Sequence, residues 1–140
     1  MYRKASLEKF VDVKAIVLRF NEYINNHDVD GLASLMTKDH TFISRLNDVQ
    51  QGKEEMIKNW EQFFKVFPKY RNEIKFVYSK GDFVILVGKS EMLEGPAIWT
   101  AYVDRKQNKI SEWRVYDDTV KNRNILGIDE SIIAPTTNTE

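Results

Sequence analysis

The sequence contains no cysteine, and this absence excludes disulfide bonds, thiolate catalysis and zinc sites built on cysteine. It contains two histidines, His27 and His40, so a metal site would have to rely on carboxylates. A bound metal needs several converging ligands, and no such set is indicated. We therefore expect no metal and no organic cofactor.

The chain also lacks an excess of charge of either sign, because its 21 basic residues balance its 21 acidic residues. A neutral surface does not attract nucleic acid or anionic lipid, so we expect neither as a partner. No stretch is apolar enough to span a membrane, and the opening residues, MYRKASLEKF, lack the apolar run of a secretory signal. These absences favour a soluble, cytoplasmic protein.

The sequence does contain enough apolar surface for a folded core, since 42% of its 140 residues are hydrophobic and 12% are aromatic. This composition argues against disorder, and the length suits one domain. The apolar pattern fades after Thr119, and the last residues read IAPTTNTE. We expect one domain over residues 1–125 and a C-terminal tail, partly flexible, over residues 126–140.

Three segments in the first half of the chain have helical patterns. Apolar residues recur at helical spacing over residues 7–25, with charged residues elsewhere on the helical wheel. Asp28 is a suitable N-cap for a second, short helix. A third helix is predicted to begin at Gly52 and to end before Pro68, because proline cannot continue a helix.

The remaining segments have the patterns of strands. β-Branched and aromatic residues favour an extended conformation for residues 40–46, and four more strand-like runs cover residues 72–79, 82–93, 97–105 and 109–118. The short, turn-like linkers between these four runs predict antiparallel neighbours. The sequence therefore predicts an α+β fold, in which three N-terminal helices pack beside an antiparallel sheet. A curved sheet wrapped around a long helix would leave a conical cavity of the kind that binds small molecules.

Several stretches together resemble a known family. They are FNEYINNHDVDGLASLMTKDHTF, GKEEMIKNWEQFF, AIWTAYVD and KISEWRVYDD. Their order is similar to that of the nuclear transport factor 2-like superfamily and, within it, of the SnoaL-like proteins. The resemblance implies a cone-shaped, cystatin-like roll that often forms homodimers and holds a pocket inside the cone. Because functions in this superfamily are diverse, the fold alone does not establish an activity.

The catalytic groups of two characterised groups of relatives do not occur in this chain. Ketosteroid isomerases have a tyrosine, a carboxylate base and a second acid where this chain has Phe20, Ser44 and Thr100. Limonene epoxide hydrolases have an aspartate where this chain has Val115. The resemblance therefore implies neither of these activities by the mechanism of the relatives.

The resemblance also implies which side chains face the pocket. The expected lining residues are Phe20, Phe42, Ser44, Trp60, Thr100, Tyr102, Trp113 and Val115. Aromatic residues of this kind form either a cage for a ligand or simply the core. Trp99 is expected to point away from the cone, onto the outer sheet face that relatives use for dimerisation, and we expect a homodimer through that face.

Asp117 and His40 are the candidates for acid–base chemistry. Burial beside Trp113 would raise the pKa of the Asp117 carboxyl and allow it to transfer protons near neutral pH. The alternative is a solvated strand end or an ion-pair partner of a lysine or arginine. His40 is the expected partner of Asp117, since imidazole transfers protons at physiological pH. The alternative for His40 is a structural role as a turn or capping residue. His27 is expected to belong to the turn before Asp28.

We consider three functions and leave open whether the protein is an enzyme. In the first, the cone binds a small, largely apolar organic molecule, and any catalysis is proton transfer by Asp117 and His40 with Tyr102 as a hydrogen-bond donor. In the second, the protein is a non-catalytic module that binds a ligand or another protein. In the third, it is a dimerisation domain whose own aromatic side chains fill the cone.

Overall fold

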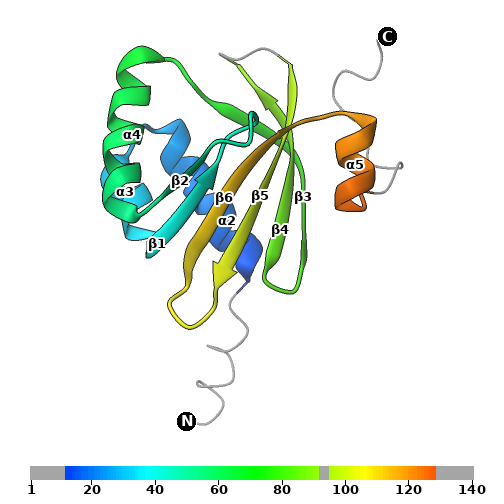
Figure 1. The fold of residues 1–140 in the computed structure, drawn as a ribbon, viewed down its shortest axis with the longest axis horizontal. Coiled ribbons are helices and arrows are strands. Elements are labelled where there is room, and N and C mark those ends of the chain that lie inside the picture. Colours follow the sequence, from blue (N-terminus) through cyan, green and yellow to red (C-terminus); the bar gives the residue numbers. More distant parts are fainter. Residues whose placement is uncertain (1–11, 92–94, 129–140) are drawn as a thin grey trace.

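The computed structural model describes residues 12–91 and 95–128 (Figure 1). Its helices are α2 (Val13–Asn25), α3 (Val29–Ser34), α4 (Lys53–Val66) and α5 (Val120–Leu126). Its strands are β1 (Met36–Ile43), β2 (Val49–Gln51), β3 (Asn72–Lys80), β4 (Phe83–Ser90), β5 (Pro96–Asp104) and β6 (Lys109–Asp117). Within the described residues, no helix is long and apolar enough to cross a membrane.

The helix boundaries follow from local chemistry. Asp12 caps α2 by accepting a hydrogen bond from the backbone N–H two residues on, and residues 7–11 of the predicted helix lie outside the described residues. Asp28 caps α3 through its carboxylate, as predicted. Gly52 precedes α4 with a φ of 107°, a conformation that glycine adopts without strain. The helix ends at Val66, shortly before Pro68.

One curved sheet of six strands, in the order β2-β1-β6-β5-β4-β3, forms the body of the molecule. The strands β3 to β6 pair as antiparallel neighbours, which confirms the prediction from their short linkers. The sheet as a whole is mixed, because β1 pairs with β6 in parallel. These two strands are not joined by a turn. The chain leaves β1 through β2 and α4 and returns through three further strands, so the antiparallel rule for hairpins does not apply to them.

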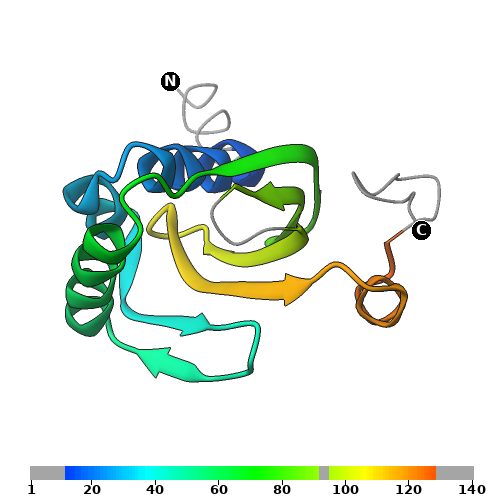
Figure 2. The same ribbon diagram turned by 90° about the horizontal axis from the view of Figure 1, so that it is seen from above.

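The curvature of the sheet gives it an inner and an outer side. Helix α2 packs across β3 to β6 on the inner side, and α4 lies over β1 and β2. Figure 2 shows these two helices closing the concave side, with α5 beyond the opposite side. The predicted α+β cone is therefore confirmed. Its interior is the larger of the two hydrophobic clusters and includes Phe20, Leu86, Trp99 and Trp113.

The predicted orientation of β5 was wrong by one residue. Trp99 faces the interior, opposite Val115 on β6, and Thr100 faces outward beside Arg114. Tyr102 also faces outward. A shift of one residue moves every side chain of a strand to the other face. Alternation does not reveal this shift because residues 97–101 are all buried, whichever face they occupy.

Helix α5 is an element that the fading apolar pattern after Thr119 did not predict. Thr119 caps it by accepting a hydrogen bond from the backbone N–H of Asn122, and Gly127 ends it with a φ of 70°. Leu126 and the buried Ile128 pack against the outer side of β4 and β5. The predicted tail, 126–140, therefore begins with residues that contact the sheet, and residues 129–140 lie outside the described residues.

Candidate functional site

A cavity of about 490 Å³ lies between α4 and the inner side of β1, β5 and β6. Helix α4 contributes Trp60 and Phe63 to its wall, and the sheet contributes Trp99 and Trp113. These residues reach the cavity because α4 presents its apolar side to the sheet, and alternate residues of β5 and β6 point inward. The result is a concave, mainly apolar space of a size suited to a small organic molecule.

The predicted lining residues divide into three groups. Those around the cavity are Phe42, Ser44, Trp60, Trp113 and Val115. Phe20 lies deeper, fully buried, with its ring centroid 4.8 Å from that of Trp113. Thr100 and Tyr102, expected in the cavity, are on the outer side of the sheet. Trp99, expected on the outer side, lines the cavity.

The aromatic residues of the cavity also support one another. The ring centroids of Trp60 and Phe64 are 5.3 Å apart and stacked, and Phe42 meets Trp60 edge-on at 6.3 Å. Phe63 meets Tyr70 edge-on at 4.8 Å. Such pairs add to the stability that burial alone supplies. The same residues therefore form part of the core and part of the cavity wall.

His40 is a buried core residue outside the cavity lining. Its Nδ1 lies 2.8 Å from the carbonyl oxygen of Ile110, so Nδ1 carries the proton and donates it. Its Nε2 has no hydrogen-bond partner among the described residues. Burial lowers the pKa of His40, although the hydrogen bond to Ile110 and the charge of Asp39 oppose this effect. The neutral imidazole is therefore favoured.

Asp117 lies at the exposed end of β6 and forms an ion pair with Arg45, with Nη1 and Oδ1 2.9 Å apart. The carbonyl that His40 binds is at the other end of this strand, about 20 Å away at the usual rise per residue. The structure therefore does not bring His40 and Asp117 together as an acid–base pair. The alternative for Asp117 in the sequence analysis, an ion-pair partner at a strand end, describes what the structure contains.

Ser44 belongs to the turn between β1 and β2. Its hydroxyl oxygen accepts hydrogen bonds from the backbone N–H groups of Leu46 and Asp48, both at 3.2 Å. The predicted strand 40–46 therefore ends at Ile43, and the residues after it form this turn. Ser44 reaches the rim of the cavity, and its hydroxyl oxygen accepts the two hydrogen bonds that hold the turn.

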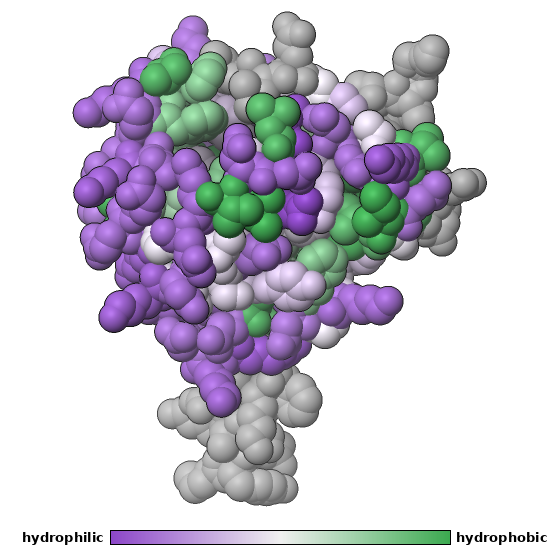
Figure 3. All heavy atoms as spheres, viewed as in Figure 1, coloured by the Kyte–Doolittle hydropathy of each residue, from purple (hydrophilic) through white to green (hydrophobic). Residues whose placement is uncertain are grey.

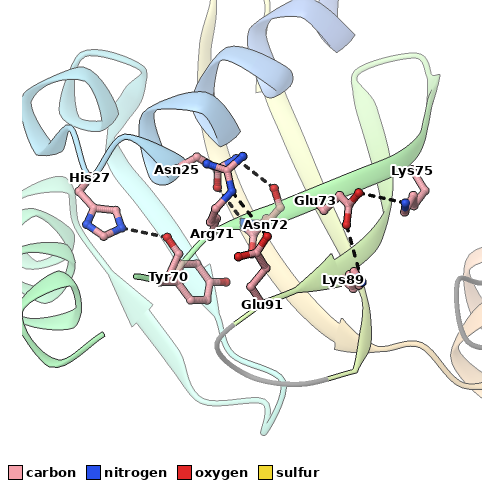
Figure 4. Close-up of polar contacts among 9 residues, drawn as sticks. All are labelled: Asn25, His27, Tyr70, Arg71, Asn72, Glu73, Lys75, Lys89 and Glu91. Carbon is pink, nitrogen blue, oxygen red and sulfur yellow. Dashed lines mark hydrogen bonds and ion pairs between the residues drawn. The ribbon is translucent and has the colours of Figure 1, made fainter. Parts of the chain in front are cut away.

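Tyr70 is a site residue that the sequence analysis did not identify. It lies between α4 and β3, lines the cavity and is 7% exposed (Figure 4). Burial raises the pKa of its phenol, and the neighbouring Ser90 and Asn72 side chains offset part of that effect. The phenol is therefore protonated at neutral pH and can donate a hydrogen bond into the cavity.

Two further polar atoms lie beside Tyr70. Asn72 and Ser90 are directly opposite each other on β3 and β4, and both are almost completely buried. Both side chains lie against the phenol of Tyr70 and lower its pKa through hydrogen bonding, and neither residue lines the cavity. Of these three residues, Tyr70 is the one that reaches the cavity, and Asn72 and Ser90 support its phenol from behind.

The backbone around this polar end is held in place by neighbouring side chains (Figure 4). Asn25 exchanges two hydrogen bonds with the backbone of Asn72, at 2.7 and 3.0 Å. His27 Nε2 donates to the carbonyl oxygen of Tyr70 at 2.9 Å, and its ring stacks on Phe64. His27 is thus in a turn, as predicted, and in addition it positions Tyr70.

Within the described residues, no group of three or more histidine, aspartate or glutamate side chains is placed to hold a metal ion. Among the described residues that line the cavity, Arg45 is the only charged one. The site therefore offers an apolar body, one cation and a neutral polar end.

Comparison with known proteins assigns the family. The sequence pattern of the SnoaL-like domain matches residues 17–119, which is most of the chain. The chain belongs to the SnoaL-like family. No curated protein matches this SnoaL-like chain.

Solved structures share the fold at low sequence identity. A proposed SnoaL-like polyketide cyclase from Shewanella putrefaciens superposes with a TM-score of 0.68 at 17% identity, covering 91% of this chain and 93% of its own. A nuclear transport factor 2-like protein of unknown function from Cytophaga hutchinsonii gives 0.65 at 17% identity, with 84% and 96% covered. SalBIII, an epoxide hydrolase/cyclase-like enzyme of salinomycin pyran ring formation, gives 0.64 at 19%, with 74% and 88% covered. Identities this low establish the fold only.

Proposed function

We propose that this SnoaL-like protein binds a small, largely apolar organic molecule in the cavity between α4 and β6. The observation that carries the proposal is the mainly apolar cavity of about 490 Å³ with the buried, protonated hydroxyl of Tyr70 at one end. An apolar body gains affinity from burial against Trp60 and Trp113. A carbonyl or hydroxyl group on the molecule accepts the hydrogen bond of Tyr70, and this contact sets its orientation.

Binding rather than proton transfer is the role that the site supports best. Among the described residues that line the cavity there is no aspartate, glutamate or histidine to act as a general base. SalBIII, one of the proteins with this fold, is described as an enzyme of pyran ring formation. For the present chain, Tyr70 supports the simpler action of polarising a bound carbonyl or hydroxyl group.

Native mass spectrometry of the gently purified protein tests this proposal. We expect the native protein to be heavier than the denatured chain by the mass of a retained small molecule. Val115→Phe narrows the cavity and should abolish retention, while Tyr116→Phe, on the outer side of the same strand, should preserve it. Retention that is unchanged in a folded Val115→Phe protein would place the molecule elsewhere and contradict the proposal.

We also propose that two copies pair through the outer sheet face. Tyr102 is 46% exposed there and packs on Phe83, and the buried atoms Thr100 Oγ1 and Arg114 Nε have no partner among the described residues. A second copy would cover the aromatic pair. Figure 3 is drawn from the side on which the sheet lies in front of α2, and its apolar side chains form several patches among hydrophilic ones.

Light scattering coupled to size-exclusion chromatography measures this association. The wild-type protein should elute with the mass of a dimer, and Tyr102→Glu should elute as a monomer. Val66→Glu is the matched control, because Val66 is exposed on α4, which packs on the inner side of the sheet. A wild-type monomer at high concentration would rule out the pairing.

A further inference from the structure

The cavity is asymmetric in charge. Its described lining consists of apolar residues, a few neutral polar ones and a single cation, Arg45. Arg45 comes from the turn between β1 and β2, so its guanidinium stands at the rim, while Trp60 and Trp113 form the walls. A lone cation beside an apolar space attracts ligands that carry one negative charge on an apolar body.

The ion pair of Arg45 leaves most of its hydrogen-bonding capacity unused. Nη1 donates to Asp117, and the other N–H groups have no acceptor among the described residues. The side chain of Asp117 is 57% exposed and is not part of the cavity lining. Pairs exposed to this degree are weak, because water screens them. A ligand anion at the rim can therefore compete with Asp117 or share the guanidinium with it.

Arg45 and Tyr70 line the same cavity, so one ligand can contact both. Burial raises the pKa of Tyr70, and the positive charge of Arg45 is among the smaller influences that lower it. The positive charge of Arg45 is therefore close enough to influence the pKa of the Tyr70 phenol. A molecule that reaches from one to the other meets a positive charge at one end, aromatic walls in the middle and a neutral hydrogen-bond donor at the far end.

We infer that the ligand of this cavity is an organic acid, an inference that rests on the proposed function. Its carboxylate binds Arg45 at the rim, and its apolar, ring-containing body lies between Trp60 and Trp113. A carboxylate matches the planar donors of the guanidinium and carries the single charge that one arginine neutralises.

Calorimetric titration with 2-naphthylacetate and its neutral analogue 2-naphthylacetamide tests the inference. The acid should bind at least about tenfold more tightly than the amide, as expected for a hydrogen bond to a charged group. Arg45→Gln should remove this preference by weakening the acid alone. Asp117→Asn removes the competing carboxylate and should strengthen the acid several-fold. Arg71→Gln is the control, since Arg71 pairs with Glu91 on the surface and does not line the cavity.

Each outcome has a distinct meaning. Loss of acid binding in Arg45→Gln together with a gain in Asp117→Asn supports the inference, and the gain cannot result from damage to the fold. Equal affinities for the acid and the amide, or an acid affinity unchanged in Arg45→Gln, overturn the inference and leave cavity binding intact. Binding of neither compound overturns the inference too, and retention of a molecule in native mass spectrometry then decides the proposed function separately.

Discussion

The imidazole of His40 is fully buried and donates Nδ1–H to the carbonyl oxygen of Ile110. Protonating Nε2 would place a charge among apolar groups such as Phe20, whose ring centroid is 6.0 Å away. This cost is the reason that burial lowers the pKa of His40. At the residue scale, the surroundings of His40 thus give it a structural role.

The sign of the resulting pH dependence follows from this lowered pKa. Above the ordinary histidine pKa of 6.5, the imidazole is neutral in both states. Below it, the unfolded chain binds a proton that the folded protein does not, so the free energy of unfolding falls as the pH drops. Denaturant unfolding at several pH values should show a shallower fall in His40→Gln than in the wild type between about pH 6.5 and 5.5. Identical slopes would show that His40 does not titrate differently on folding.

Tyr70 is the residue whose change should separate binding from folding. Tyr70→Phe removes the hydroxyl and keeps the ring that contacts Phe63. We expect a loss of ligand affinity of about tenfold and a change in the free energy of unfolding within about 1 kcal/mol, since one neutral hydrogen bond is lost. Calorimetry on the retained ligand measures the first quantity, with Tyr116→Phe on the outer face as the control. Full affinity in Tyr70→Phe would remove Tyr70 from the site.

At the scale of elements, the close contact of β3 and β4 depends on Gly88. A Cβ atom at this position would fall on the backbone carbonyl oxygen of Glu73, which cannot rotate away as a side chain can. The β3–β4 pairing also shifts register here, between Ile74 and Phe76. This pair of strands carries Asn72 and Ser90, so its geometry also sets the polar end of the cavity.

Gly88→Ala should therefore lower the free energy of unfolding by about 3 kcal/mol, the upper end for overpacking. Lys89→Ala, at the exposed neighbouring position, should change it by less than about 0.5 kcal/mol. Urea denaturation of the two variants gives both values. A stable Gly88→Ala protein would mean that β3 and β4 can separate locally without loss.

The elements also show what the sequence can and cannot predict. Helix caps and hairpins depend on neighbouring residues, so Asp28, Gly52 and the four antiparallel strands were predicted correctly. The parallel pairing of β1 with β6 depends on residues far apart in the chain. The orientation of β5 was predicted wrongly because its outward-facing residue Ile98 is as buried as its inward-facing neighbours. The cluster that contains Ile128 covers Ile98 on the outer side of the sheet.

At the scale of the whole molecule, the site is assembled by long-range contacts. Tyr70 and Asn72 are close together in the chain, but Ser90 comes from the far end of β4, and no local sequence motif predicts that it meets them. The hydrogen bond of His40 likewise joins residues 70 positions apart. The apolar wall was easier to predict, since Phe42, Trp60, Trp113 and Val115 occupy the positions that the family resemblance implied.

The central claim is that a small molecule occupies the cavity beside Tyr70, and a crystal structure of the gently purified protein tests it most directly. The account predicts electron density for a bound molecule between Trp60 and Trp113, with a polar atom within hydrogen-bond distance of Tyr70 Oη. A cavity closed by its own aromatic side chains, with no room for a ligand, would contradict the account and leave the protein as a dimerisation domain.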